Sequence, residues 1–173
     1  MTKPTILATI VVLSSLFGCA SRDKTSVPQT IEEYPALTNI KNIYIASLGN
    51  EEGAGLVRER IRLRLAKSTR IVVVETPGQA DAVLMGVAGV ERQYSGSSGN
   101  LRTRYASTAV LRLVNVKTSE TLWRFEYSSD GGGPRPFGGF TSVSSISNSV
   151  ADRTVDKLLK DVTYADSKSR LIQ

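Results

Sequence analysis

The side chains that most often catalyse reactions or bind metals are scarce in this chain of 173 residues. It has no histidine, the commonest general base and metal ligand, and a single cysteine, Cys19. No Asp-rich segment has the ligand spacing of a calcium or magnesium loop, and no serine lies in a nucleophile elbow. Carboxylate pairs such as Glu51-Glu52 are adjacent, as is usual on a solvated surface. The sequence therefore predicts a protein without enzyme activity, metal or cofactor.

The one cysteine lies where a lipid can be attached to it. Lys3 supplies a positive charge, and the apolar run from Thr5 to Phe17 is too short to span a bilayer, which takes about 20 residues. This is the pattern of a secretion signal. It ends in Leu16-Phe17-Gly18-Cys19, which resembles the bacterial lipobox, whose cysteine is lipidated and becomes the first mature residue. An ordinary signal peptide or an uncleaved anchor is the alternative.

The lipobox resemblance implies a cellular location as well as a lipid anchor. Ala20 follows the cysteine, in place of the aspartate that retains lipoproteins at the inner membrane, so we expect the periplasmic face of the outer membrane. Acyl chains at about 0.8 kcal/mol per buried methylene make such an anchor permanent. We expect a signal peptide over residues 1–18 and a polar tether over 19–38, which lets a folded domain stand off the membrane.

Two glycine-rich segments, Tyr94–Arg104 and Asp130–Phe140, are predicted to be loops. They contain aromatic and arginine side chains, which are common anchors of protein interfaces. The candidate partner-binding residues are Tyr94, Arg102, Arg104, Arg135, Phe137 and Phe140. Alternatively, Phe137 and Phe140 fold back over an end of the core.

Two other features have simpler interpretations. The segment Gly49–Gly55 follows a strand and opens a helix, as phosphate loops do, but it lacks the Gly-Lys-Ser/Thr ending, and two glutamates would repel phosphate. We interpret it as a strand-to-helix turn. The basic helix face of Arg58, Arg62 and Lys67 is either solvated or a docking face. The net charge of +6 is modest and spread along the chain, and nucleic acid is not expected as a partner of an exported protein.

The periodicity of the remaining chain predicts one α+β (α/β) domain over residues 39–163, followed by a polar tail at 164–173 that frays. Strands are expected at 40–48, 70–75, 82–92, 107–116 and 121–127, and helices at 53–67 and 142–161. In the first helix, Leu56 and Leu63 are expected to widen the apolar stripe. The elements form a mixed sheet of about five strands with two main helices, in the order β-α-β-β-β-β-α.

Three aromatic residues, Trp123, Phe125 and Tyr127, share one face of the last strand. A row of this kind is either a ligand platform or part of the core. Because the three residues have strand spacing, we expect the row to be part of the core.

The pattern as a whole resembles bacterial envelope proteins of the CsgG/LpoB/TolB-amino-terminal type. The resemblance rests on Ile43–Ala46, Arg70–Glu75, Ala80–Gly86 and the hairpin Val110–Trp123, in which Asn115 and Ser119 replace the family's usual Asp and Gly. It implies a lipoprotein that binds other envelope proteins or assists their assembly, without catalysis. Homo-oligomers occur among such proteins, but a CsgG-type pore does not fit these short glycine-rich segments. The alternative is an enzyme of envelope metabolism with an unrecognised Ser or carboxylate site.

Overall fold

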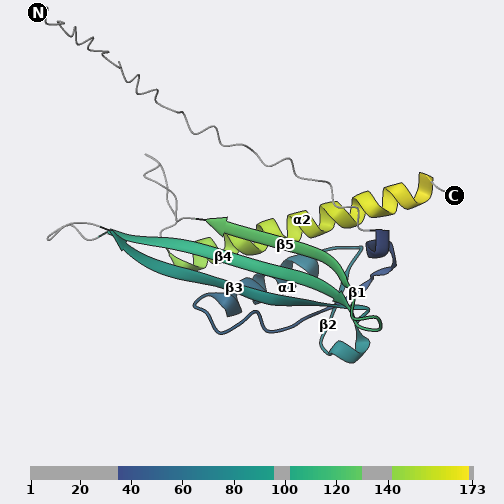
Figure 1. Cartoon of the computed structure of the whole chain (residues 1–173), viewed down its shortest axis with the longest axis horizontal. Coiled ribbons are helices and arrows are strands. Elements are labelled where there is room, and N and C mark those ends of the chain that lie inside the picture. The colour runs from purple at the N-terminus through teal and green to yellow at the C-terminus, as the bar shows by residue number, and fades with distance from the viewer. Residues whose placement is uncertain (1–34, 96–101, 130–141, 172–173) are drawn as a thin grey trace, which may run out of the picture. The chain divides into compact units, whose positions relative to one another are not determined.

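The domain begins with a strand–helix–strand unit, as the change of apolar period predicts. The computed structural model describes residues 35–95, 102–129 and 142–171. Strand β1 (Asn42–Ile45) leads into α1 (Ala54–Leu65), and β2 (Val72–Val74) then lies parallel to β1 (Figure 1). Gly53 precedes α1 with a φ of 81°, a left-handed conformation that costs glycine little. The segment Gly49–Gly55 is thus a strand-to-helix turn.

Three long strands complete the sheet. β3 (Ala82–Ser95) lies parallel to β1, and β4 (Arg102–Asn115) and β5 (Thr121–Ser129) follow as antiparallel neighbours, giving the order β2-β1-β3-β4-β5. The helix α2 (Val143–Leu171) ends the described chain. The α+β fold class and the predicted order of five strands and two helices are therefore confirmed.

The hairpin turn between β4 and β5 forms with Asn115 and Ser119 in place of Asp and Gly. Ser119 has a φ of 58°, so it adopts the left-handed backbone for which glycine is usual. The Asn115 side-chain oxygen accepts hydrogen bonds from the backbone N–H groups of Lys117 and Thr118, at 2.8 and 3.1 Å. Asn115 thus supplies the acceptor that an aspartate would supply, and the hairpin closes despite the backbone strain at Ser119.

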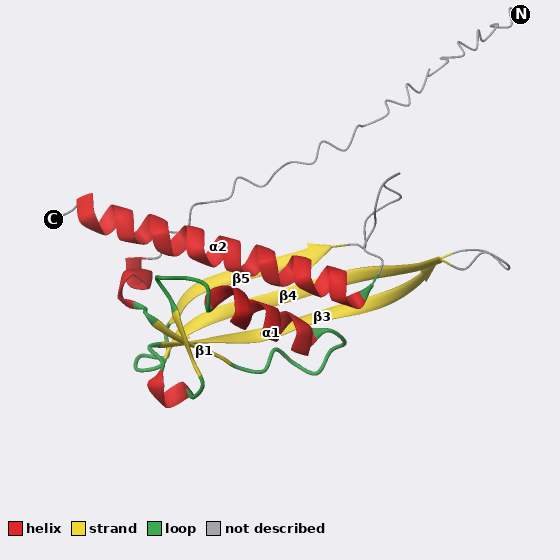
Figure 2. Ribbon diagram, turned by 180° about the vertical axis from the view of Figure 1, so that it is seen from behind, coloured by secondary structure: helices red, strands yellow, loops and turns green. Residues whose placement is uncertain are grey.

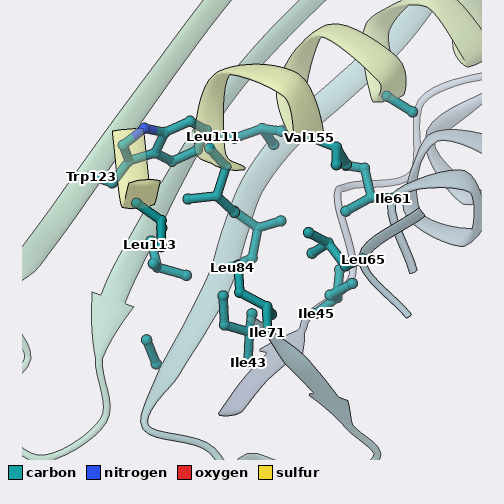
Figure 3. Packing of buried hydrophobic residues seen from close by; sticks show 14 of the residues in the cluster. Ile43, Ile45, Ile61, Leu65, Ile71, Leu84, Leu111, Leu113, Trp123 and Val155 are labelled. Atoms are coloured by element: carbon teal, nitrogen blue, oxygen red, sulfur yellow. The ribbon is translucent and has the colours of Figure 1, made fainter. Parts of the chain in front are cut away.

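Both helices cover the same face of the sheet (Figure 2). Along β3 and β4 the side chains that point toward the helices are buried, among them Leu84, Leu111 and Leu113. Figure 3 shows these leucines packed with Ile61 of α1 and Val155 of α2. Because neighbouring side chains on a strand point to opposite faces, this arrangement gives the sheet one buried side and one side that no described helix covers.

The aromatic row of β5 belongs to the covered side, and the prediction that Trp123 is a core residue is confirmed. Trp123 is 0% exposed, and its indole Nε1 donates a hydrogen bond of 2.8 Å to the Asp161 carboxylate of α2. The Trp123 and Phe125 rings are nearly parallel, with centroids 5.9 Å apart, and Arg153 lies over the Tyr127 ring. The row is therefore packed against α2 and is not an open platform.

Two other arginines of α1, Arg60 and Arg64, pair with α2. Arg60 makes a salt bridge with Asp152 of α2 at 3.0 Å, and Arg64 makes one with Asp156 at 2.9 Å. These pairs join the two helices on their outer side.

On the basic face of Arg58, Arg62 and Lys67, Arg58 donates a hydrogen bond of 3.1 Å to the Ile45 carbonyl oxygen, Arg62 makes an exposed salt bridge of 3.0 Å with Glu59, and Lys67 is exposed. This face therefore has ion pairing of the solvated kind beside one internal contact.

The structure differs from the sequence predictions in one helix face and in two segment boundaries. Leu56 and Leu63 are 49% and 50% exposed, because only the narrower stripe of α1 meets the sheet and α2. The predicted tether to residue 38 is too long, since Leu37 lies in a 3-10 helix, η1 (Pro35–Asn39), and is fully buried. The predicted polar tail is largely helical, because α2 continues to Leu171. Ala165, 6% exposed, and the ion pair between Asp166 and Arg70 explain this extension.

Candidate functional site

The sheet side away from the helices carries large apolar side chains in contact with solvent. Val72 of β2, Val87 of β3 and Val110 of β4 are 56%, 53% and 59% exposed. Val87 and Val110 lie directly opposite each other in the β3–β4 register. Scattered exposed apolar side chains such as Val72 are ordinary on protein surfaces, whereas Val87 and Val110 are adjacent and form a small apolar patch. We call this side of the sheet the open face.

A hollow of about 360 Å³ lies on the open face, where β3, β4 and β5 run side by side. Its lining consists of Gly86, Val87, Val110, Leu111, Arg112, Arg124 and Glu126. Gly86 has a φ of +141°, and a Cβ built on it would come within 2.1 Å of the Val110 carbonyl oxygen. A larger residue would not fit there, so the backbones of β3 and β4 form part of the lining.

Two arginines of the hollow face each other across neighbouring strands. Arg112 of β4 is the direct register partner of Arg124 of β5, and both side chains are exposed. Like charges in this position destabilise a sheet. Neither guanidinium makes a salt bridge or hydrogen bond with another described residue. In contrast, Arg60, Arg64 and Arg70 all pair with aspartates, so Arg112 and Arg124 are two facing arginines without an ion-pair partner among the described residues.

Three aspartates, Asp81, Asp152 and Asp166, are held as carboxylates by their neighbours. The backbone N–H groups of Asn42 and Lys41 bond to Asp81 and lower its carboxyl pKa, and the Arg70 guanidinium lowers the pKa of Asp166 in the same way. Burial alone would raise the pKa of Asp152, but its arginine partners outweigh burial and lower it. A general acid needs a pKa near the working pH, and these groups are shifted the other way. No cluster of metal-ligating side chains occurs within the described ranges.

Of the predicted partner-binding residues, the structure describes Tyr94, Arg102 and Arg104, which lie on the paired ends of β3 and β4. Tyr94, 67% exposed, is near the end of β3, and Arg102 and Arg104 begin β4, so the prediction of a loop there is wrong for these positions. The strands extend further than expected because cross-strand pairing continues to Ser95 and Arg102. Tyr94 is opposite Thr103, while Arg104 is opposite Gln93. Arg135, Phe137, Phe140 and the lipidation residue Cys19 lie outside the described residues, and their roles stay predictions.

The sequence analysis missed Arg112, Arg124 and Glu126. The signal was present, because Leu111 and Leu113 alternate with Arg112, and Trp123 and Phe125 alternate with Arg124 and Glu126. Once the hairpin turn is placed, the two arginines fall opposite each other. Partner-binding residues were expected only in glycine-rich segments, whereas these three residues lie at strand positions that face solvent.

Comparisons with known proteins identify neither a family nor an activity. No protein-family model matches the chain, and no curated protein matches it. Among solved structures, it is similar to the PelC dodecamer from Paraburkholderia phytofirmans, at 16% identity and a TM-score of 0.47, covering 72% of this chain and 88% of that one.

It is also similar to lipoprotein B from Nitrosomonas europaea, at 16% identity and a TM-score of 0.37, with 77% of this chain and 79% of that one covered. For the rare lipoprotein B from Shewanella oneidensis the values are 15% and 0.33, with 77% and 100% covered. The neighbours thus include bacterial lipoproteins, but the finer resemblance to the CsgG/LpoB/TolB-amino-terminal type is not confirmed by them. None of the helices described here is long and apolar enough to cross a membrane.

Proposed function

We propose that the chain is a lipid-anchored protein of the bacterial outer membrane whose periplasmic domain binds another envelope protein, without catalysing a reaction. The observation that carries this proposal is the difference between the two sides of the sheet. Both helices bury one side, whereas the other exposes Val72, Val87 and Val110. The lipobox-like ending at Cys19 supports the membrane anchor.

Burial of the open face would favour binding of a partner. Each square ångström of apolar surface removed from water contributes about 25 cal/mol, less the cost of ordering two molecules. The direct pair Val87 and Val110 gives the surface an apolar centre, and the charged residues beside it supply the polar groups that fix orientation. Such a surface fits a protein partner better than a small substrate.

The anchor is tested by replacing Cys19 with serine and fractionating the cells. Serine cannot form the thioether, so we expect Cys19→Ser to leave the membrane pellet after a carbonate wash and appear in the soluble periplasmic fraction. The unchanged protein is the control. If the variant stays in the pellet, the lipoprotein proposal is wrong.

The binding surface is tested by photo-crosslinking in living cells. A photoreactive residue at position 110, on the open face, should give one crosslinked species of defined mass. The same residue at the exposed position of Lys160, on α2, serves as the control and should not give that species. Equal products at both positions, or none at position 110, would contradict the proposal. Turnover of a cell-wall or lipid substrate by the purified chain would favour the enzyme alternative.

The glycine-rich segment after β5 has a separate test. Arg135→Ala and Phe137→Ala should each weaken the crosslink from position 110 without lowering the melting temperature if these side chains contact the partner. A lower melting temperature would instead indicate that these two side chains pack against the core.

A further inference from the structure

We propose that the hollow between β3, β4 and β5 binds a carboxylate side chain, Asp or Glu, of a protein partner, held by Arg112 and Arg124. This inference rests on the proposed function, because it names the chemistry of the partner that docks on the open face. The proposal starts from the two guanidinium groups, which face each other across neighbouring strands and have no partner among the described residues.

The arginine pair is arranged for an anion. Side chains directly opposite in an antiparallel sheet have Cβ atoms about 4.5–5.5 Å apart, so both guanidinium groups can reach one anionic group in the hollow. Each is a planar fork of N–H donors that matches the two oxygens of a carboxylate. An anion between them would also remove the repulsion that the pair causes in the free domain.

The surroundings favour a protein carboxylate over a phosphate. Glu126 also lines the hollow and is the register partner of Val110, so it sets a negative charge beside the site. That charge opposes a doubly charged phosphate more than a singly charged carboxylate. Val87 and Val110 flank the arginines with exposed apolar surface, which an apolar side chain of the same protein segment can cover. At about 360 Å³ the hollow is at the small end of ligand pockets, which start at about 300 Å³.

The experiment measures binding of a defined probe to the lipidated chain in detergent micelles. The chain is labelled with nitrogen-15, and the Nε–H signals of Arg112 and Arg124 are followed during titration with the blocked peptide Glu-Ser-Val. We expect saturable shifts of both signals, and none from the blocked peptide Gln-Ser-Val, which has the same shape without the charge. Arg112→Gln and Arg124→Gln should each weaken binding about tenfold, because each removes charged hydrogen bonds.

A matched control separates a specific site from the overall positive charge. The double variant Lys117→Gln/Lys160→Gln loses as much charge as Arg112→Gln/Arg124→Gln but changes exposed residues outside the hollow. Its affinity should stay within about twofold of the unchanged chain. Equal weakening in the two double variants would show an effect of net charge and overturn the proposal.

Two further probes decide the source of the anion. Inorganic phosphate and vesicles containing phosphatidylglycerol are titrated in parallel with the peptide. Larger shifts of the two arginine signals with phosphate or vesicles than with the glutamate peptide would assign the hollow to a phosphate group and overturn the proposal. Absence of any peptide-induced shift would do the same.

The outcomes also separate this inference from the proposed function. If the crosslink from position 110 survives Arg112→Gln/Arg124→Gln unchanged, the open face binds a protein but the arginines do not hold its carboxylate. If no crosslink forms in the unchanged chain while the glutamate peptide binds, the carboxylate site stands and the proposed protein partner falls.

Discussion

The two sides of the sheet are built from the same strands, but their side chains affect the stability of the fold in opposite ways. On the covered side, alternate residues of β3, β4 and β5 meet α1 and α2, and the Trp123 indole N–H is paired with the Asp161 carboxylate. On the open side, the residues between them expose valines to water and set Arg112 opposite Arg124. One side stabilises the fold, and the other keeps an arrangement that costs stability. Natural proteins retain such costs mainly where function needs them.

The largest expected effect is on the covered side, at Trp123. Trp123→Ala removes a fully buried indole and leaves Asp161 without one of its hydrogen bonds. Loss of a buried aromatic side chain costs about 3–5 kcal/mol, so the melting temperature should fall by many degrees or soluble expression should cease. Thermal unfolding followed by circular dichroism measures this. An unchanged melting curve would mean that the aromatic row is exposed, and the contrast between the two sides would fail.

Gly86 of β3 leaves no room for a Cβ beside the backbone of β4, and its replacement tests the hollow's backbone lining. Gly86→Ala places a Cβ within 2.1 Å of the Val110 carbonyl oxygen in a left-handed backbone, which should cost about 2–4 kcal/mol. Gly78→Ala is the matched control, because no atom lies within 4 Å of the added Cβ. Urea unfolding should show a large loss for position 86 and almost none for position 78. Similar curves for both variants would disprove the close approach.

Asp81 fixes the alignment of β1 with β3, on which both sides of the sheet depend. Its carboxylate accepts hydrogen bonds from Asn42 and Lys41, at 2.8 and 3.0 Å, and its pKa is lowered below the unfolded value of about 3.9. The stabilisation is therefore complete above the unfolded pKa and is lost as the pH falls through the lower folded pKa. Asp81→Ala should cost about 1–3 kcal/mol at pH 7.

The pH dependence provides the check on this prediction. Unfolding free energies of the unchanged chain and of Asp81→Ala are measured at pH 7 and again at pH 2.5, and their difference should be smaller at the acidic pH. A difference that does not shrink at low pH would assign the effect to lost packing, not to the charged hydrogen bonds of Asp81.

Much of the fold was predictable from the sequence, because apolar periodicity and turn residues determine it locally. The period change between Ile43 and Ile61 predicted the strand–helix–strand unit, and the Asn115–Ser119 turn predicted the β4–β5 hairpin. Features that depend on distant contacts were not predictable in this way. The length of α2 beyond Asp161 depends on the pairing of Asp166 with Arg70, which is far away in sequence.

The candidate site was less predictable for a related reason. Aromatic and arginine residues in glycine-rich segments follow a compositional rule, and that rule gave Tyr94 and Arg102 as loop residues, although both lie on strands. The pair Arg112 and Arg124 is recognised only from the register of two strands, and its lack of partners only from the packed structure.

The smallest stability change should come from the arginine pair, and it should have the opposite sign. Arg112→Glu replaces two like charges by an opposite-charge pair across β4 and β5, which contributes about 0.2–1 kcal/mol to the free energy of unfolding. High salt should reduce the gain, because it screens exposed charges. Chemical unfolding at low and high salt measures both effects. A loss of stability would show that the arginine pair stabilises the domain. The statement that the open side keeps an arrangement that costs stability would then be wrong.

The most direct test of the central claim separates binding from folding at Val110. In the membrane-anchored chain, Val110→Ser is combined with a photoreactive residue at position 87, and crosslinking in cells is compared with unfolding of the purified variant. Because Val110 is 59% exposed, its replacement should change the unfolding free energy of the domain by no more than about 0.5 kcal/mol. We predict that the crosslinked species from position 87 decreases strongly while stability is retained. An unchanged crosslink, or its loss together with the folded domain, would contradict the account.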